Sequence, residues 1–92
     1  MEPIVIWDLD EEPDGNVRHI EEHGITKDEV EDILQNEDNE TDASDSSGRP
    51  ITFGWTNTGK HLAVVWEEAG DDPRMVYPIT AYETPPRKGP GE

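Results

Sequence analysis

The sequence predicts a single α+β domain, with two short N-terminal helices packed on one face of a small antiparallel sheet. Three observations lead to this prediction. Residues 51–66 alternate apolar side chains with polar or small ones on both sides of Thr56-Asn57-Thr58-Gly59, which is typical of a half-buried hairpin. Before the hairpin, two short segments have helical apolar spacing and residues typical of helix ends. A chain of 92 residues has room for one small core.

The N-terminal part supplies one strand and both helices. Residues 3–8 contain a continuous apolar run, which predicts a short strand in a central or well-covered position. Residues 16–23 have the spacing of a helix that ends at Gly24, since glycine accepts the left-handed backbone that ends many helices. Thr26 and Glu29 have the spacing of a capping box, in which each residue hydrogen-bonds the backbone of the other. A second helix therefore follows Thr26.

Two acidic segments separate the remaining elements. Residues 36–48 contain one alanine and no larger apolar residue, which predicts a mobile loop with a marginal edge strand near residues 39–43. The central hairpin comes next and contains two of the three tryptophans and the only phenylalanine. A second acidic stretch, residues 67–73, predicts a turn.

The last strand, residues 74–82, is interrupted by Pro78. Proline cannot donate a backbone hydrogen bond, so this strand is expected at an edge of the sheet or bulged at Pro78. Residues 84–92 are rich in proline and glycine and predict a flexible tail. The domain therefore comprises residues 1–83, with the expected order β-α-α-(β)-β-β-β.

The formal net charge of −16 lies almost entirely in the first half of the chain. Residues 1–48 carry 17 acids and 2 bases, so this half repels nucleic-acid phosphates and acidic membranes and favours a basic protein partner. Adaptation to high salt is the other explanation for the acidity. The absence of cysteine excludes disulfides and thiolate chemistry. With neither a basic leader nor an apolar span, the sequence predicts a cytoplasmic protein that does not enter membranes.

Short motifs between residues 4 and 82 occur in an order that resembles a known family. They are Trp7-Asp8 after the first strand, His23-Gly24-Ile25 between the helices, Arg49 and Gly59-Lys60 around the hairpin, and Ile79-Thr80-Ala81 in the last strand. In order and spacing they resemble the BrnT toxins, small ribonucleases of bacterial type II toxin–antitoxin pairs with a RelE-like fold. The resemblance implies a metal-independent endoribonuclease that needs no cofactor, and a basic, antitoxin-like protein partner.

RNA cleavage on such a fold requires a general base, a general acid and cations that stabilise the charged phosphorane. Arg49 and Lys60 are the candidate cations, because both flank the hairpin and both match the family. His23 is the candidate for proton transfer. Tyr82 is a candidate proton donor, or a surface on which a base stacks. These four residues form the predicted catalytic site.

Two features of the sequence keep other functions open. Tyr77 and Tyr82 stand where the last strand of the family carries arginines, so the alternative is a non-catalytic, acidic protein-interaction module on the same fold. His19 and His23 are four residues apart and share a helix face, as two metal ligands would, but no third ligand follows from the spacing. No metal is therefore predicted. The sequence contains no signal of the oligomeric state.

Overall fold

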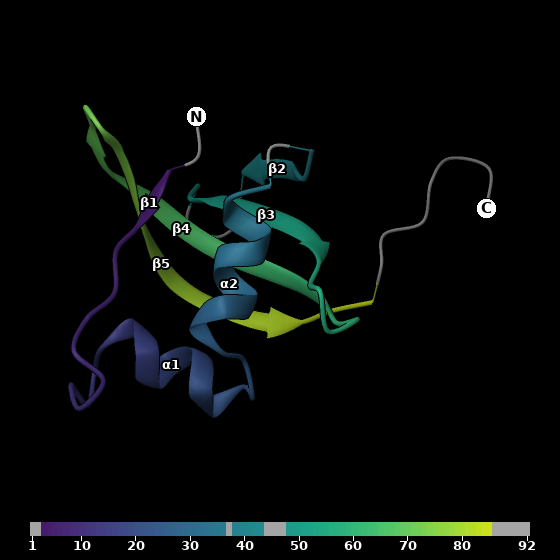
Figure 1. Cartoon of the computed structure of the whole chain (residues 1–92), viewed down its shortest axis with the longest axis horizontal. Coiled ribbons are helices and arrows are strands. Elements are labelled where there is room, and N and C mark those ends of the chain that lie inside the picture. The colour runs from purple at the N-terminus through teal and green to yellow at the C-terminus, as the bar shows by residue number, and fades with distance from the viewer. Residues whose placement is uncertain (1–2, 37, 44–47, 86–92) are drawn as a thin grey trace.

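The computed structural model describes residues 3–36, 38–43 and 48–85. In chain order these residues form β1 (Ile4–Val5), α1 (Asn16–Glu22), α2 (Lys27–Leu34), β2 (Glu40–Ala43), β3 (Pro50–Trp55), β4 (His61–Asp71) and β5 (Arg74–Glu83) (Figure 1). The α+β class predicted from the sequence is confirmed. Within the described residues, neither helix has the length and apolar character needed to cross a bilayer.

The strands form one five-stranded sheet in the order β1-β5-β4-β3-β2. β1 runs parallel to β5, whereas the other neighbouring strands are antiparallel. The expectation of an antiparallel sheet is therefore wrong, because the sheet is mixed. The physical reason is the return path of the chain. The two helices carry the chain away from β1, and the last strand comes back beside β1 in the same direction.

β1 occupies an edge of the sheet, which corrects the expectation of a central position. It has two residues, and the Ile4 side chain is 47% exposed. The apolar run continues past the strand, where Trp7 packs against the core. Its indole N–H donates a hydrogen bond of 2.9 Å to Glu31 of α2. Trp7, at the end of the apolar run, therefore packs beside α2 instead of extending the sheet.

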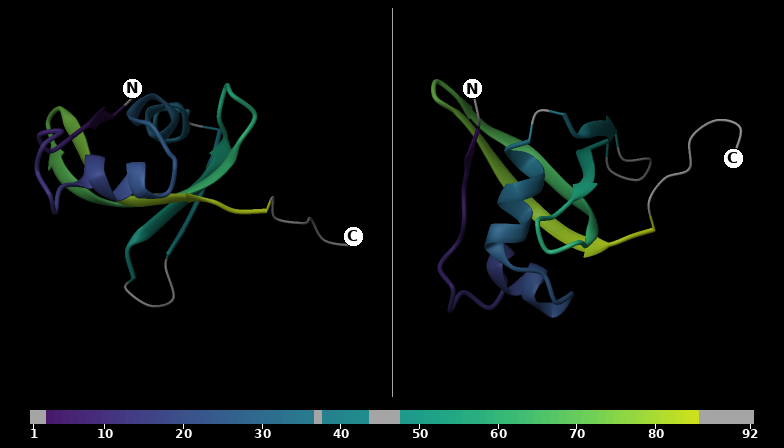
Figure 2. Two further views of the ribbon diagram at one scale, coloured as in Figure 1. Left: turned by 90° about the horizontal axis from the view of Figure 1, so that it is seen from below. Right: turned by 45° about the vertical axis from the view of Figure 1, so that its right-hand side comes forward.

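Both helices lie on the same face of the sheet, as the left view of Figure 2 shows. The core forms between them and β4 and β5. Its buried residues are Ile20, Ile25, Val30, Ile33, Leu62, Val64, Trp66, Val76 and Ala81. The apolar stripe of each helix and the alternating residues of β4 meet there, so burial of these side chains holds the two layers together.

The hairpin β3–β4 turns at residues 56–59, as predicted. Gly59 adopts φ +88°, a left-handed conformation that glycine accepts without strain, and the Thr56 N–H donates to Lys60 O at 2.8 Å. β4 is longer than expected, because residues 67–71 are strand and the turn contains only Asp72 and Pro73.

Pro78 lies beside a bulge in β5. The register places Val65 opposite Thr80 and Trp66 opposite Pro78, so the intervening Ile79 is the extra residue. β1 pairs only with Met75 and Val76, so Pro78 has no strand partner on that side and its missing N–H leaves no gap in a ladder.

The acidic segment 36–48 contains the expected edge strand as β2. Thr41 and Thr52 link β2 to β3 through a hydroxyl–hydroxyl hydrogen bond of 2.7 Å. Position 37, positions 44–47 and most of the predicted tail, 86–92, lie outside the described residues.

Candidate functional site

The structure does not bring all four residues predicted as a catalytic site together. Arg49 precedes β3, and Lys60 follows the turn at its other end. The six residues of β3 lie between them, which corresponds to about 20 Å along an extended strand. Arg49 and Lys60 therefore cannot hold the same phosphate group.

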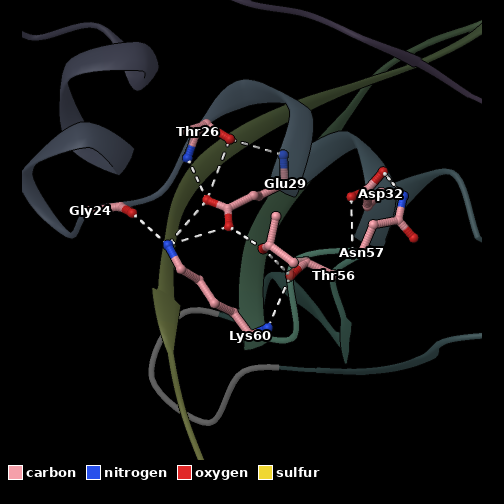
Figure 3. A network of polar contacts seen from close by, with 8 residues as sticks. Gly24, Thr26, Glu29, Asp32, Thr56, Asn57 and Lys60 are labelled. Carbon is pink, nitrogen blue, oxygen red and sulfur yellow. Dashed lines mark hydrogen bonds and ion pairs between the residues drawn. The ribbon is translucent and has the colours of Figure 1, made fainter.

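The Lys60 ammonium lies against the start of α2 (Figure 3). Its Nζ is 3.3 and 3.4 Å from the two carboxylate oxygens of Glu29 and 3.1 Å from Gly24 O. Glu29 is buried, and it also accepts hydrogen bonds from Thr58 Oγ1 at 2.8 Å and from Thr26 N at 3.0 Å. The pair fastens the hairpin turn to the capping box of α2.

The Glu29 carboxylate is ionised in this setting. Burial by itself would raise its pKa, but the hydrogen bonds from Thr58 and the Thr26 N–H, together with Lys60, outweigh burial and lower the pKa below its usual 4.5. The charge of Lys60 is therefore balanced inside the protein. This arrangement gives Lys60 a structural role.

Arg49 lies at the other end of the hairpin, next to an acid of β4. Its Nε is 3.4 Å from Glu67 Oε2, and both side chains are close to half exposed. An exposed pair of this kind contributes little to stability. Its place at the far end of β3 separates Arg49 from His23 and Tyr82 as well as from Lys60.

His23 and Tyr82 are the two predicted residues that the fold brings together. Their ring centroids are 6.4 Å apart, with the rings nearly perpendicular. His23 Nδ1 lies 2.8 Å from Ala81 O, and a carbonyl oxygen only accepts, so Nδ1 carries the proton. In the neutral ring, Nε2 is therefore the proton acceptor.

The His19–His23 pair does not extend to a metal site in the part of the chain that the structure describes. No three side chains among histidine, aspartate and glutamate gather there at positions that would hold an ion. His23 instead ends α1 and binds the backbone of β5.

The sheet has a second face, which neither of the two described helices covers (Figure 2). Strand register places three rows of side chains on this face, because directly paired residues point the same way and neighbours along a strand alternate. The rows are Ile51–Val65–Thr80, Phe53–Ala63–Tyr82 and Trp55–His61. We call these residues the uncovered face.

The uncovered face takes the larger side chains of β3. Thr52 and Gly54 point toward the helices, where Gly54 leaves room for Asn39: a Cβ on Gly54 would lie 2.4 Å from Asn39 Nδ2. The alternation in β3 was visible in the sequence. Its direction was not, because an apolar alternation does not say which side the helices cover.

Exposed aromatic rings and an acidic border distinguish the uncovered face. Trp55 is 58% exposed and Tyr82 is 38% exposed, while Phe53 is half-buried. On β2, Glu40 pairs with Phe53 and Asp42 pairs with Ile51, so acids flank the rows at that edge. The result is an apolar centre beside carboxylates.

Comparisons with models of protein families, with curated proteins and with solved structures each find no match.

Proposed function

We propose that this protein is a protein-binding module that holds a basic partner against the uncovered face. The observation that carries the proposal is Trp55, an indole more than half exposed on the sheet face that neither described helix covers. Exposed apolar patches on small domains mark interaction sites, and tryptophan and tyrosine are the residues most often found at the energetic centre of an interface.

The charge of the chain selects the kind of partner. A net charge of −16 attracts a basic protein and repels RNA. Acids of β2 lie beside the apolar centre, because Glu40 pairs with Phe53 and Asp42 pairs with Ile51. The partner that fits has apolar side chains for the centre and lysine or arginine side chains for the border. A basic antitoxin would belong to this class of partner.

Two synthetic peptides test the proposal. Both alternate valine and phenylalanine with a charged residue, which is lysine in one and glutamate in the other. In NMR titrations of the full chain, the lysine peptide should shift the signals of the uncovered face and bind more weakly as salt rises. The glutamate peptide should not bind.

Matched variants separate the face from the rest of the surface. Trp55→Ala should weaken binding of the lysine peptide at least tenfold, as expected at the centre of an interface. Leu9→Ala removes an apolar side chain that is 69% exposed in the connection before α1, and it should leave binding unchanged. Equal binding of both peptides, or self-association through this face in analytical ultracentrifugation, would reject the proposal.

A toxin-like ribonuclease is the second candidate, and the contact between His23 and Tyr82 favours it. An imidazole whose Nδ1 is held by the Ala81 carbonyl, beside a phenol, has the groups for proton transfer. The active protein should cleave RNA in the presence of EDTA. His23→Gln and Tyr82→Phe should each reduce the rate at least tenfold while the protein stays folded. Absence of cleavage by the unaltered protein would reject this candidate.

A further inference from the structure

β2 ends the sheet on one side, and among the residues that the structure describes no strand lies beyond it. All of its residues, Glu40–Ala43, are exposed. We propose that the basic partner adds an extended segment to the outer edge of β2 as an additional antiparallel strand. The inference rests on the proposed function and says how the acidic border of the uncovered face holds the partner.

The hydrogen bonds of the hairpin show which backbone groups of β2 point outward. Thr56 N donates to Lys60 O at 2.8 Å, so the backbone of Thr56 points toward the strand that follows. Backbone groups alternate between the two sides of a strand, so Phe53, at an odd spacing from Thr56, points its N–H and C=O toward β2. Phe53 pairs with Glu40, so Glu40 binds β3 and the next residue, Thr41, directs its N–H and C=O to the outer edge.

The opposite edge of the sheet is occupied. β1 pairs with the start of β5 there. Further along β5, the Asn16 amide donates to Pro78 O at 3.0 Å, and His23 Nδ1 donates to Ala81 O at 2.8 Å. Residues of α1 therefore take up backbone carbonyls that a new strand beside β5 would need, and β2 is the edge at which the sheet can grow.

The side chains of β2 select a basic strand. Glu40 and Asp42 point to the uncovered face, because they pair directly with residues of β3 that lie on it. In an antiparallel strand centred opposite Thr41, the residues facing Glu40 and Asp42 point to the same side, at about 5 Å between Cβ atoms. Lysine or arginine at these two positions, separated by one residue, would form opposite-charge pairs across the strands.

The same charges disfavour a second copy of this chain at the edge. Two β2 strands paired antiparallel around Thr41 would place Glu40 of each copy opposite Asp42 of the other. Like charges directly opposite one another destabilise strand pairing, and charged residues on edge strands keep sheets from associating. The occupant that the edge fits is therefore a basic segment of a different protein.

A short peptide tests strand addition by itself. The edge peptide, acetyl-Thr-Lys-Val-Lys-Thr-amide, can place its valine opposite Thr41 and its lysines opposite Glu40 and Asp42. The valine N–H and C=O would then bond to Thr41, while the lysine N–H groups would point away from β2. N-methylation of the valine should therefore abolish binding, whereas N-methylation of the lysine after it should leave binding unchanged.

NMR titration of the full chain measures this binding. The edge peptide should shift the Thr41 amide signal in a saturable way and slow its hydrogen exchange. Thr41→Pro removes the outward N–H and should weaken binding about fivefold, as expected for one backbone hydrogen bond. Thr41→Val keeps the N–H and loses only the hydroxyl contact with Thr52, so it should bind as the unaltered protein does.

A charge variant tests the selection of a basic strand. Glu40→Gln should weaken binding of the edge peptide about two- to fivefold, the range expected for one cross-strand charge pair. Glu22→Gln removes an equal charge from an exposed position on α1 and should have no effect. Equal binding of the two N-methylated peptides would overturn strand addition without recourse to any variant. Self-association of the full chain that Thr41→Pro abolishes would also overturn it, because a second copy would then occupy the edge.

The two proposals can fail separately. If the longer lysine peptide binds and Trp55→Ala weakens that binding, but the edge peptide does not bind, the docking surface stands and strand addition is rejected. If the edge peptide protects the Thr41 amide but the longer peptide leaves the signals of the uncovered face in place, strand addition stands and docking across the face is rejected.

Discussion

Asp8 and Asn16 hydrogen-bond each other twice, through the backbone N–H of one and the side chain of the other. Asp8 N donates to Asn16 Oδ1 at 2.9 Å, and Asn16 N donates to Asp8 Oδ2 at 3.0 Å. The Asn16 amide also donates to Ile6 O and to Pro78 O, each at 3.0 Å. One buried asparagine therefore ties the segment after β1, the start of α1 and the bulged part of β5 together.

Replacing Asn16 with alanine should reduce the free energy of unfolding by about 2–4 kcal/mol, because three hydrogen bonds disappear and buried carbonyl groups lose their donor. Urea unfolding followed by tryptophan fluorescence measures the change. Glu22→Ala, at an exposed position on the same helix, should stay within about 0.5 kcal/mol of the unaltered protein. Equal effects of the two substitutions would contradict a linking role for Asn16.

Tyr77 should make stability fall at high pH. The hydrogen bond to Asp8, then burial, raise the pKa of Tyr77 from 10.0 to about 12. A raised folded pKa contributes stability below the unfolded pKa, and this is lost as the pH rises from about 10 toward about 12. Urea unfolding at pH 9 and pH 11 should therefore show that the free energy of unfolding falls less in Tyr77→Phe than in the unaltered protein.

Tyr82→Phe is the matched control for this experiment, because Tyr82 is 38% exposed and lies on the uncovered face. Tyr82→Phe should lose as much stability between pH 9 and pH 11 as the unaltered protein does.

Tyr77→Phe should also change how the stability of the protein falls at low pH. The Tyr77 hydroxyl is the main cause of the lowered pKa of Asp8, a group that stabilises the fold above its unfolded pKa of 3.8 and loses this effect as the pH falls.

Lys60→Met should destabilise the protein by about 1–3 kcal/mol, since it leaves the buried Glu29 carboxylate without its cation. The value lies below that for a fully buried pair because the Lys60 side chain is 35% exposed and its charge is partly screened. Lys27→Met breaks an exposed pair with Asp10 and should cost at most about 0.5 kcal/mol. Urea unfolding of the two variants at neutral pH compares them directly.

The Lys60→Met variant should also differ from the unaltered protein in how its stability falls at low pH. The lowered pKa of Glu29 gives stability that is present above its unfolded value of 4.5 and is lost as the pH falls through the folded pKa. Without the ammonium group this contribution shrinks, so the loss between about pH 5 and pH 3 should be smaller in Lys60→Met. An identical acid profile would mean that Lys60 does not stabilise the Glu29 charge.

Trp66 and Trp55 are expected to have different roles, Trp66 in stability and Trp55 in binding. Trp66 is buried and its indole N–H donates to Thr52, so Trp66→Phe should cost about 2 kcal/mol in unfolding free energy from the lost hydrogen bond and the unfilled space. Trp55→Phe should stay within about 0.5 kcal/mol, since most of that side chain faces solvent. Thermal and urea unfolding measure both. A large stability loss in Trp55→Phe would show that the uncovered face belongs to the core.

Local features of the fold followed from the sequence because they depend on neighbouring residues. The capping box of Thr26 and Glu29 is present, with both of its hydrogen bonds, and Gly24 takes the left-handed backbone after α1. Gly59 does the same in the hairpin turn. Each of these depends on contacts within about four residues, which the order of the residues specifies directly.

The start of α1 depends on a contact between residues that are not neighbours in the sequence. Asp14 is a candidate N-cap by position, but α1 begins after Gly15, which has no side chain to cap it. The carboxylate that accepts from Asn16 N belongs to Asp8, eight residues earlier. Such a cap forms only after the chain has folded back, so no window of sequence contains its signal.

The candidate site likewise has features that follow from the local sequence and features that depend on the tertiary structure. The sequence by itself determined the end of α1 at Gly24, the capping box of α2, the hairpin turn and the net acidity, since these follow from local geometry and composition. Only the tertiary structure decided that Lys60 neutralises Glu29, that His23 meets Tyr82, and that the large side chains of β3 point away from the helices. The physical reason is that each of these contacts joins elements far apart in the chain, and their partners are fixed by packing and strand register.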